Sequence, residues 1–293
     1  MYDQILFPTD GSDGAMVAFG HALDIAAAHD GTVRILNVAD TTQISATRIQ
    51  GQVVDALEQE GQRIVSEAED RAERRDVTSL TEVIQGEPYS TIVRYADAHD
   101  IDLVVMPTHG REGLEEYLLG STTERVVRRS NVPVLTVPFE PKSRVEYPYQ
   151  DLLVPTDGSG CAERALSMAV DIANTEDAAL HLVSVISHSM LGVDRGETSR
   201  ATRLEERADE LIEEAKTFAG EAGIGAVFGS VEEGSSVSQA ILSYIDERAI
   251  DLVVMGTHGR TGFDRYALGS VTEKLVRTAP VPVLTVRTSE EGQ

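Results

Sequence analysis

The chain has 293 residues, enough for two domains of ordinary size. Its formal net charge of −24 repels polyphosphate backbones and anionic lipid surfaces, so we expect neither nucleic acid nor a membrane as partner. Strong acidity is also a device of halophiles, and we expect a high-salt cytoplasm as its solvent.

Cys161 is the only cysteine, which excludes an intrachain disulfide and a zinc cluster of thiolates. The first residues lack the basic start and apolar core of a signal peptide. No apolar run approaches the ~20 residues that span a bilayer. We therefore expect a soluble cytoplasmic protein.

The predicted elements follow one another as short apolar runs and amphipathic stretches. In the first half we expect strands at 5–8, 32–38, 77–84, 101–106 and 132–137. The helices lie between them, at about 12–30, 44–75, 88–100 and 122–130.

The second half repeats this order, because the chain is an internal duplication. ILFPTDGS at 5–12 returns as LLVPTDGS at 152–159, and IDLVVMPTHGR at 101–111 returns as IDLVVMGTHGR at 250–260. Prolines and mixed charges interrupt the pattern between the copies. We predict two tandem domains, 1–141 and 150–293, joined by a linker at 142–149.

Alternating strands and helices predict an α/β fold, in which each domain is a Rossmann-like, five-stranded parallel sheet with helices on both faces. In strand order 3-2-1-4-5, the ligand crevice lies at the carboxyl ends of strands one and four. PTDGS follows strand one and the glycine-rich stretch follows strand four. Two loops that are distant in sequence therefore converge on one predicted crevice.

The fifth strand, VPVLTV, occurs at 132–137 and again at 281–286. An open apolar edge strand would be an aggregation hazard. We expect the two copies to pair with each other, giving a pseudo-dimer within the chain; a helix covering each edge is the alternative. A further homo-oligomer is compatible with either.

The stretch at 256–270, GTHGRTGFDRYALGS, has the character of an anion-binding turn. Glycines bring backbone N–H groups close to a phosphate, and the following helix contributes the positive end of its dipole. The alternative is a tight turn before a capped helix. Ser270 with Glu273, and Ser121 with Glu124, have the S-x-x-E spacing of a capping box, which we expect in both copies.

Asp10 and Asp157 follow the first strand of each copy. Either carboxylate could accept a ribose hydroxyl or help hold a divalent cation such as Mg through water; capping the next helix is the alternative. For His109 and His258 we favour a structural role in the loop. Their neighbours Arg111 and Arg260 could reach a phosphate or stay solvated. Neither copy contains the lysine motif of a P-loop.

The sequence resembles the universal stress protein family over nearly its whole length. The resemblance rests on the motif G-2x-G-9x-G-S after a DLVVM strand and on V-P-T-D at the end of an earlier strand. The resemblance implies the adenine-nucleotide α-hydrolase-like fold and ATP binding in some members. For copy two it implies a nucleotide site formed by Thr156, Asp157, Val185, Gly256, Gly259, Gly269, Ser270 and Val271.

Copy one departs from this pattern, since Pro107 replaces the first glycine and has no N–H to offer a phosphate. The remaining positions imply a second, weaker site formed by Thr9, Asp10, Val38, Gly110, Gly120, Ser121 and Thr122. We predict that ATP, or ADP or AMP, binds better in copy two.

Three functions follow. The leading one is a nucleotide-binding stress-response protein in which ATP is a structural or regulatory ligand, with slow hydrolysis at most, because neither a general base nor a lysine clamp is evident. A nucleotide-free scaffold is the second. The third is an ATP-using ligase. The stretch TDGSDGA at 9–15 bears only a faint resemblance to the phosphate loop of such enzymes.

Overall fold

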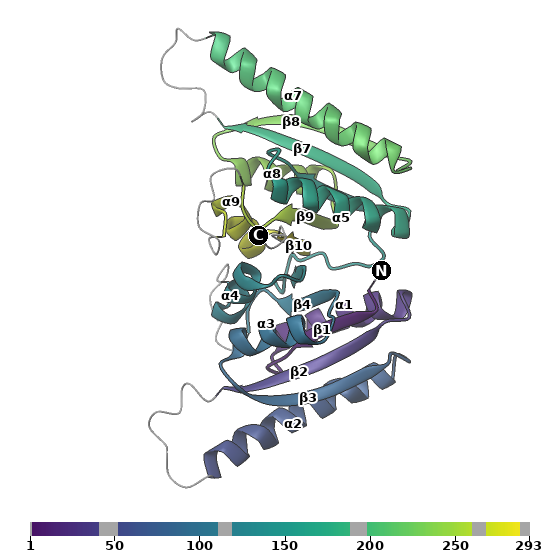
Figure 1. Cartoon of the computed structure of the whole chain (residues 1–293), viewed down its shortest axis with the longest axis vertical. Coiled ribbons are helices and arrows are strands. Elements are labelled where there is room, and N and C mark those ends of the chain that lie inside the picture. The colour runs from purple at the N-terminus through teal and green to yellow at the C-terminus, as the bar shows by residue number, and fades with distance from the viewer. Residues whose placement is uncertain (1, 41–51, 111–118, 188–197, 260–267, 288–293) are drawn as a thin grey trace. The chain divides into compact units, whose positions relative to one another are not determined.

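The computed structural model describes residues 2–40, 52–110, 119–187, 198–259 and 268–287 (Figure 1). The chain divides into two compact units, Met1–Tyr147 and Pro148–Gln293, here domains 1 and 2. Among the described residues, no helix is both long and apolar enough to cross a bilayer.

Strands and helices alternate through both domains. Domain 1 contains β1 (Gln4–Pro8), α1 (Asp13–Ala28), β2 (Thr32–Asp40), α2 (Gln52–Glu73), β3 (Ser79–Gly86), α3 (Pro88–Ala98), β4 (Leu103–Pro107), α4 (Ser121–Arg129) and β5 (Val134–Val137). Domain 2 contains β6 (Asp151–Pro155), α5 (Gly160–Glu176), β7 (Ala179–Ser187), α7 (Thr198–Glu221), β8 (Val227–Gly234), α8 (Val237–Glu247), β9 (Leu252–Gly256), α9 (Ser270–Thr278) and β10 (Val283–Val286).

Each domain has a parallel sheet of the predicted order. In domain 1 the strands run β3-β2-β1-β4-β5, and in domain 2 they run β8-β7-β6-β9-β10. The central strands are apolar along their length and fully buried, as strands covered on both faces must be. The α/β fold predicted from the alternating pattern is confirmed.

Helices cover both faces of each sheet (Figure 1). In domain 1, α1 and α2 lie on one face, where Arg71 of α2 donates to the carbonyl of Met16 in α1 at 3.0 Å. The other pair, α3 and α4, packs on the opposite face. Phe7 of β1 and Phe19 of α1 pack with ring centroids 4.7 Å apart and are fully buried in the core.

The elements match the predictions, with shifts at their ends. The third strand was expected at 77–84 but runs from Ser79 to Gly86. Val77 instead closes α2, because its N–H donates to the carbonyl of Ala72 at 3.1 Å and Asp76 turns the chain with φ of 55°. The beginning of the long predicted helix, at 44–51, lies outside the described residues.

The crevice arises where the first and fourth strands part. β1 pairs with β4 at Ile5–Leu103 and Leu6–Val104, two residues before β1 ends at Pro8. β6 and β9 pair in the same way, at Leu152 and Leu153. Beyond these pairs, the loops that leave the carboxyl ends enclose the space between the strands.

Candidate functional site

The loop after β1 is a turn held by its own side chains. Gly11 has φ of 75°, a conformation that favours glycine. The Thr9 hydroxyl accepts a hydrogen bond from the Gly11 N–H at 3.1 Å, and Asp10 Oδ1 accepts one from the Ser12 N–H at 3.0 Å. Ser12 then caps α1 by accepting from the Ala15 N–H.

Domain 2 repeats this turn almost atom for atom. Gly158 has φ of 70°, and Asp157 Oδ1 accepts from the Ser159 N–H at 3.0 Å. Ser159 is the N-cap of α5. The residue that caps each helix is therefore the serine, and the aspartate's second carboxylate oxygen is directed elsewhere.

That second oxygen touches the loop after the fourth strand. Asp10 Oδ2 lies against Gly110, at a place that a Cβ on Gly110 would occupy. Asp157 Oδ2 lies against Gly259 in the same way. In each domain the two loops predicted to converge are thus in contact, and the glycine is needed because only a bare Cα leaves room for the carboxylate.

The glycine-rich loop is closed at its base. The Gly120 N–H donates to the carbonyl of Thr108 at 2.8 Å, and the Gly269 N–H donates to that of Thr257 at the same distance. His109 Nδ1 lies 3.2 Å from the Thr108 hydroxyl, and His258 makes the same contact with Thr257. These contacts fit the structural role favoured for both histidines.

The capping boxes expected at Ser121 and Ser270 are wrong. Both serines are the first helical residues, and the N-caps are Gly120 and Gly269, with no side-chain cap hydrogen bond. The glycine whose N–H donates to the loop carbonyl takes the N-cap position. Each serine is therefore the first residue inside the helix. Glu124 instead pairs with Arg128 at 2.7 Å on the helix surface.

The glycine caps leave backbone amides that suit an anion. Without a side-chain oxygen at the cap, the first-turn amides of α4 and α9 are left to water or to a ligand. They are positioned at the positive end of a helix dipole, at the carboxyl edge of the sheet. The side chain of Ser121 and that of Ser270 are both exposed at this point.

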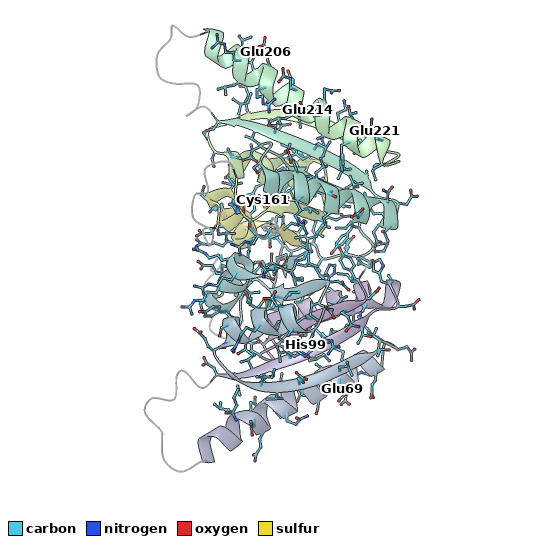
Figure 2. The ribbon with its side chains drawn as sticks, viewed as in Figure 1. Glu69, His99, Cys161, Glu206, Glu214 and Glu221 are labelled. Carbon is cyan, nitrogen blue, oxygen red and sulfur yellow. The ribbon has the colours of Figure 1, made fainter. Side chains whose placement is uncertain are left out.

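Gly256 has a second reason to be glycine that the sequence did not reveal. A Cβ there would stand 2.6 Å from the Cβ of Cys161 and 2.9 Å from its carbonyl carbon. Cys161, labelled in Figure 2, lies in the first turn of α5, and its Sγ is 3.5 Å from His258 Nε2. In domain 1 the corresponding residues are Gly14 and Pro107, and a Cβ on Gly14 would stand 3.1 Å from the carbonyl oxygen of His109 and 3.4 Å from the ring of Phe139.

A cavity of about 710 Å³ occupies the crevice of domain 1. It brings together every residue predicted for the domain 1 site: Thr9, Asp10, Val38, Gly110, Gly120, Ser121 and Thr122. Arg111 lies outside the described residues, as does Arg260 of domain 2.

The cavity also has lining residues that sequence reasoning missed. Asn37 donates to the carbonyl of Thr9 at 2.8 Å, and Asp40 ends β2. Glu87 and Tyr89 come from the start of α3. Their signal is position, because they lie near or just beyond the carboxyl ends of strands two and three.

Arg125 of α4 completes the rim. Its Nη1 lies 3.3 Å from Glu87 Oε1, and its guanidinium lies 5.0 Å from the ring centroid of Tyr89. Arg129 packs on the same ring at the same distance. Side chains of the ion pair are 55% and 39% exposed, so it contributes at most ~1 kcal/mol and a ligand could displace it.

The predicted residues of domain 2 occupy the corresponding positions. Thr156 and Asp157 follow β6, Val185 lies late in β7, and Gly256 ends β9. The glycine contacts with the carboxylate and with the loop are reproduced, at Gly259 and Gly269.

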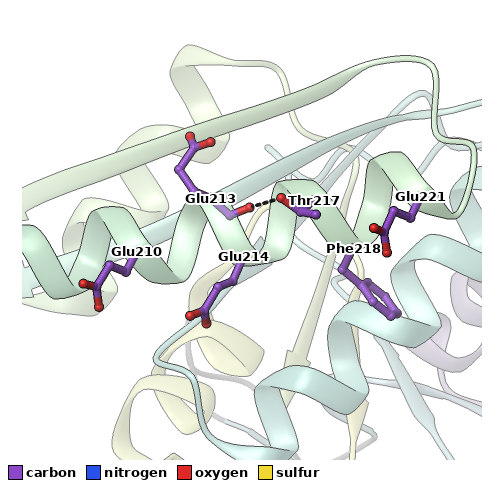
Figure 3. Close-up of a pocket in the computed structure, with 6 residues that line it drawn as sticks. All are labelled: Glu210, Glu213, Glu214, Thr217, Phe218 and Glu221. Carbon is purple, nitrogen blue, oxygen red and sulfur yellow. Dashed lines mark hydrogen bonds between the residues drawn. The ribbon is translucent and has the colours of Figure 1, made fainter.

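A different pocket lies on the outer side of α7 (Figure 3). It is lined by Glu210, Glu213, Glu214, Thr217, Phe218 and Glu221. Four carboxylates repel a phosphate, and this surface lies on a helix rather than at the strand ends. It is not a candidate for an anionic ligand.

Comparison with known proteins decides the family. The model of the universal stress protein family matches residues 1–138 and again 148–287. The chain belongs to the universal stress protein family. Its two universal stress protein domains stand in tandem.

Several relatives match a single domain. A universal stress protein of Methanocaldococcus jannaschii is 37% identical over 140 residues, which is 47% of this chain and 82% of that protein. A solved universal stress protein in complex with cAMP is 27% identical and covers 48% of this chain and 98% of its own, with a TM-score of 0.38.

Solved structures also match both domains together. The crystal structure of a universal stress protein from Archaeoglobus fulgidus covers 99% of this chain and 100% of its own. The TM-score is 0.72 at 22% sequence identity. At this identity, the likeness establishes the shared fold.

Proposed function

We propose that this universal stress protein binds adenine nucleotide in the crevice of each domain, as a structural or regulatory ligand in the response to stress. The carrying observation is the contact of Asp10 with Gly110, repeated by Asp157 and Gly259. Through this contact, the carboxylate that would accept a hydrogen bond from a ribose hydroxyl lies against the backbone of the loop that would bind the phosphates.

The phosphates would lie at the uncapped first turns of α4 and α9. Ser121 and Ser270 would add hydroxyl donors, and the helix dipole contributes about 0.3–1 kcal/mol per favourable charge. Val38 and Val185 would pack beside the adenine. Magnesium, where present, would be held chiefly by the phosphates, with the aspartate reaching it through water.

Domain 2 is proposed as the better ATP site. The Thr257 N–H donates to Val286 of β10, and successive N–H groups of a strand point to opposite sides. The N–H of Gly256 is therefore directed toward β6, across the crevice. Pro107 has no such donor.

Slow hydrolysis at most is proposed, because the described lining of the domain 1 cavity contains no lysine to neutralise a leaving phosphate.

We also propose a cytoplasmic location and pairing of the two VPVLTV strands. Each domain produced alone should then self-associate through its fifth strand, measured by sedimentation; a monomeric lone domain would count against pairing.

Titration of nucleotide-stripped protein with ATP tests the main proposal. Two binding events are expected by calorimetry, and labelled γ-phosphate should be released only over hours.

Cys161 gives a readout confined to domain 2, since this sole thiol is 3% exposed and touches His258 of the loop. ATP should slow its reaction with a thiol reagent. No heat and no protection would support the scaffold, and rapid turnover would support an enzyme.

A further inference from the structure

The two crevices differ in charge at two corresponding positions. In domain 1, Asp40 ends β2 and Glu87 immediately precedes α3, and both line the cavity. Domain 2 has Ser187 at the end of β7 and Ser236 immediately before α8. Each exchange replaces a carboxylate with a neutral hydroxyl.

The cation of the rim differs as well. Arg125 of domain 1 is paired with Glu87 at 3.3 Å and packs on Tyr89. Lys274 of α9 stands at the corresponding position, where Ser236 replaces the carboxylate. An anionic ligand entering domain 1 must compete with Glu87 for the guanidinium.

We propose that domain 1 selects an adenine nucleotide of low charge, a nucleoside monophosphate in preference to a triphosphate, whereas domain 2 takes the triphosphate. This rests on the nucleotide binding proposed above. A triphosphate carries roughly twice the negative charge of a monophosphate, so each additional carboxylate costs it more binding energy.

Volume does not decide between these ligands. The domain 1 cavity of about 710 Å³ lies within the usual range for small-molecule sites, ~300–1,000 Å³, and could hold either. Ser121 and the first turn of α4 can attract one phosphate. Asp40 and Glu87 oppose the addition of further ones, and salt weakens this opposition within a Debye length of about 8 Å.

The test compares AMP and ATP at each site of the full chain by calorimetry. Asp157→Ala disables the domain 2 site and leaves domain 1, and Asp10→Ala does the reverse. Into the first background we place Asp40→Ser with Glu87→Ser, the domain 2 residues. Glu87→Gln alone is a second variant that keeps the shape of this exposed side chain, and circular dichroism checks folding.

Domain 1 is expected to bind AMP at least as tightly as ATP at low salt, and domain 2 to prefer ATP. The double serine variant should raise the ATP-to-AMP affinity ratio of domain 1 about tenfold, and Glu87→Gln should raise it part of the way. If the ATP-to-AMP affinity ratio is equal in both domains and these substitutions do not change it, the inference is overturned. Nucleotide binding itself would still stand. Absence of binding at both sites overturns both.

Discussion

Gly256 and Cys161 lie so close that a Cβ on the glycine would stand 2.6 Å from the Cβ of the cysteine. The end of β9, which leads into the glycine-rich loop, and the first turn of α5 are therefore in direct contact. Domain 1 has Pro107 and Gly14 at the corresponding positions, and there a Cβ on Gly14 would meet the carbonyl of His109 and the ring of Phe139.

Gly256→Ala is expected to lower the free energy of unfolding by about 1–3 kcal/mol through overpacking. Cys161→Gly should relieve part of that loss, because it removes the Cβ that the new methyl group meets but leaves the carbonyl carbon of residue 161 at 2.9 Å. Urea unfolding of the two single variants and the double variant measures the coupling. Additive effects would show that the two residues are not in conflict.

Pro107→Gly is expected to strengthen ATP binding in domain 1, because it restores an N–H at the end of β4. The measurement is calorimetric titration in the Asp157→Ala background, where domain 1 alone is observed. An unchanged isotherm would mean that the missing donor does not limit this site, and would leave its carboxylates as the cause of weak binding.

His21 should make the protein sensitive to mild acid. Burial in α1, where it is 3% exposed, lowers its pKa to about 4 from 6.5. Between these values the unfolded chain binds the proton and the folded chain does not, so stability is lost as pH falls from 6.5 toward 4, by about 3 kcal/mol.

His21→Gln removes this titration while keeping a polar side chain of similar reach. The difference in unfolding free energy between the two proteins, measured from pH 7 to 4, should shift in favour of the variant as pH falls. Taking the difference cancels other groups, including Asp251, whose pKa is raised to about 6 by burial. A constant difference would contradict the prediction.

Salt should stabilise the protein. With a net charge of −24, self-repulsion opposes the compact state, and added KCl screens it. The Tm is expected to rise between 0.1 and about 2 M KCl by more than it rises in an equally concentrated uncharged osmolyte. Equal effects would argue against adaptation to a high-salt cytoplasm.

Periodicity and duplication were sufficient to predict the element order and the parallel sheets, and the crevice followed from the strand order 3-2-1-4-5 that the family resemblance implies. The elements depend on local patterns, since an apolar run such as LVVM is typical of a strand covered on both faces. The same local signals placed Asp10 and Gly110 at neighbouring strand ends, and the structure puts them in contact.

Local patterns failed where a residue's role depends on a distant neighbour. The S-x-x-E spacing at Ser121 predicted a cap, but the bond from Gly120 to Thr108, across the loop, moves the helix start. Glu87 and Arg125 come from α3 and α4, and no motif joins them in the sequence.

The sequence by itself therefore determined the family, the two α/β domains and the loops that form each crevice, because repeated motifs and hydrophobic period are local properties of the chain. Only the tertiary structure decided why Gly256 must be small and which charges line the domain 1 cavity. Those depend on side chains from different elements meeting in space, and packing and charge act across that space.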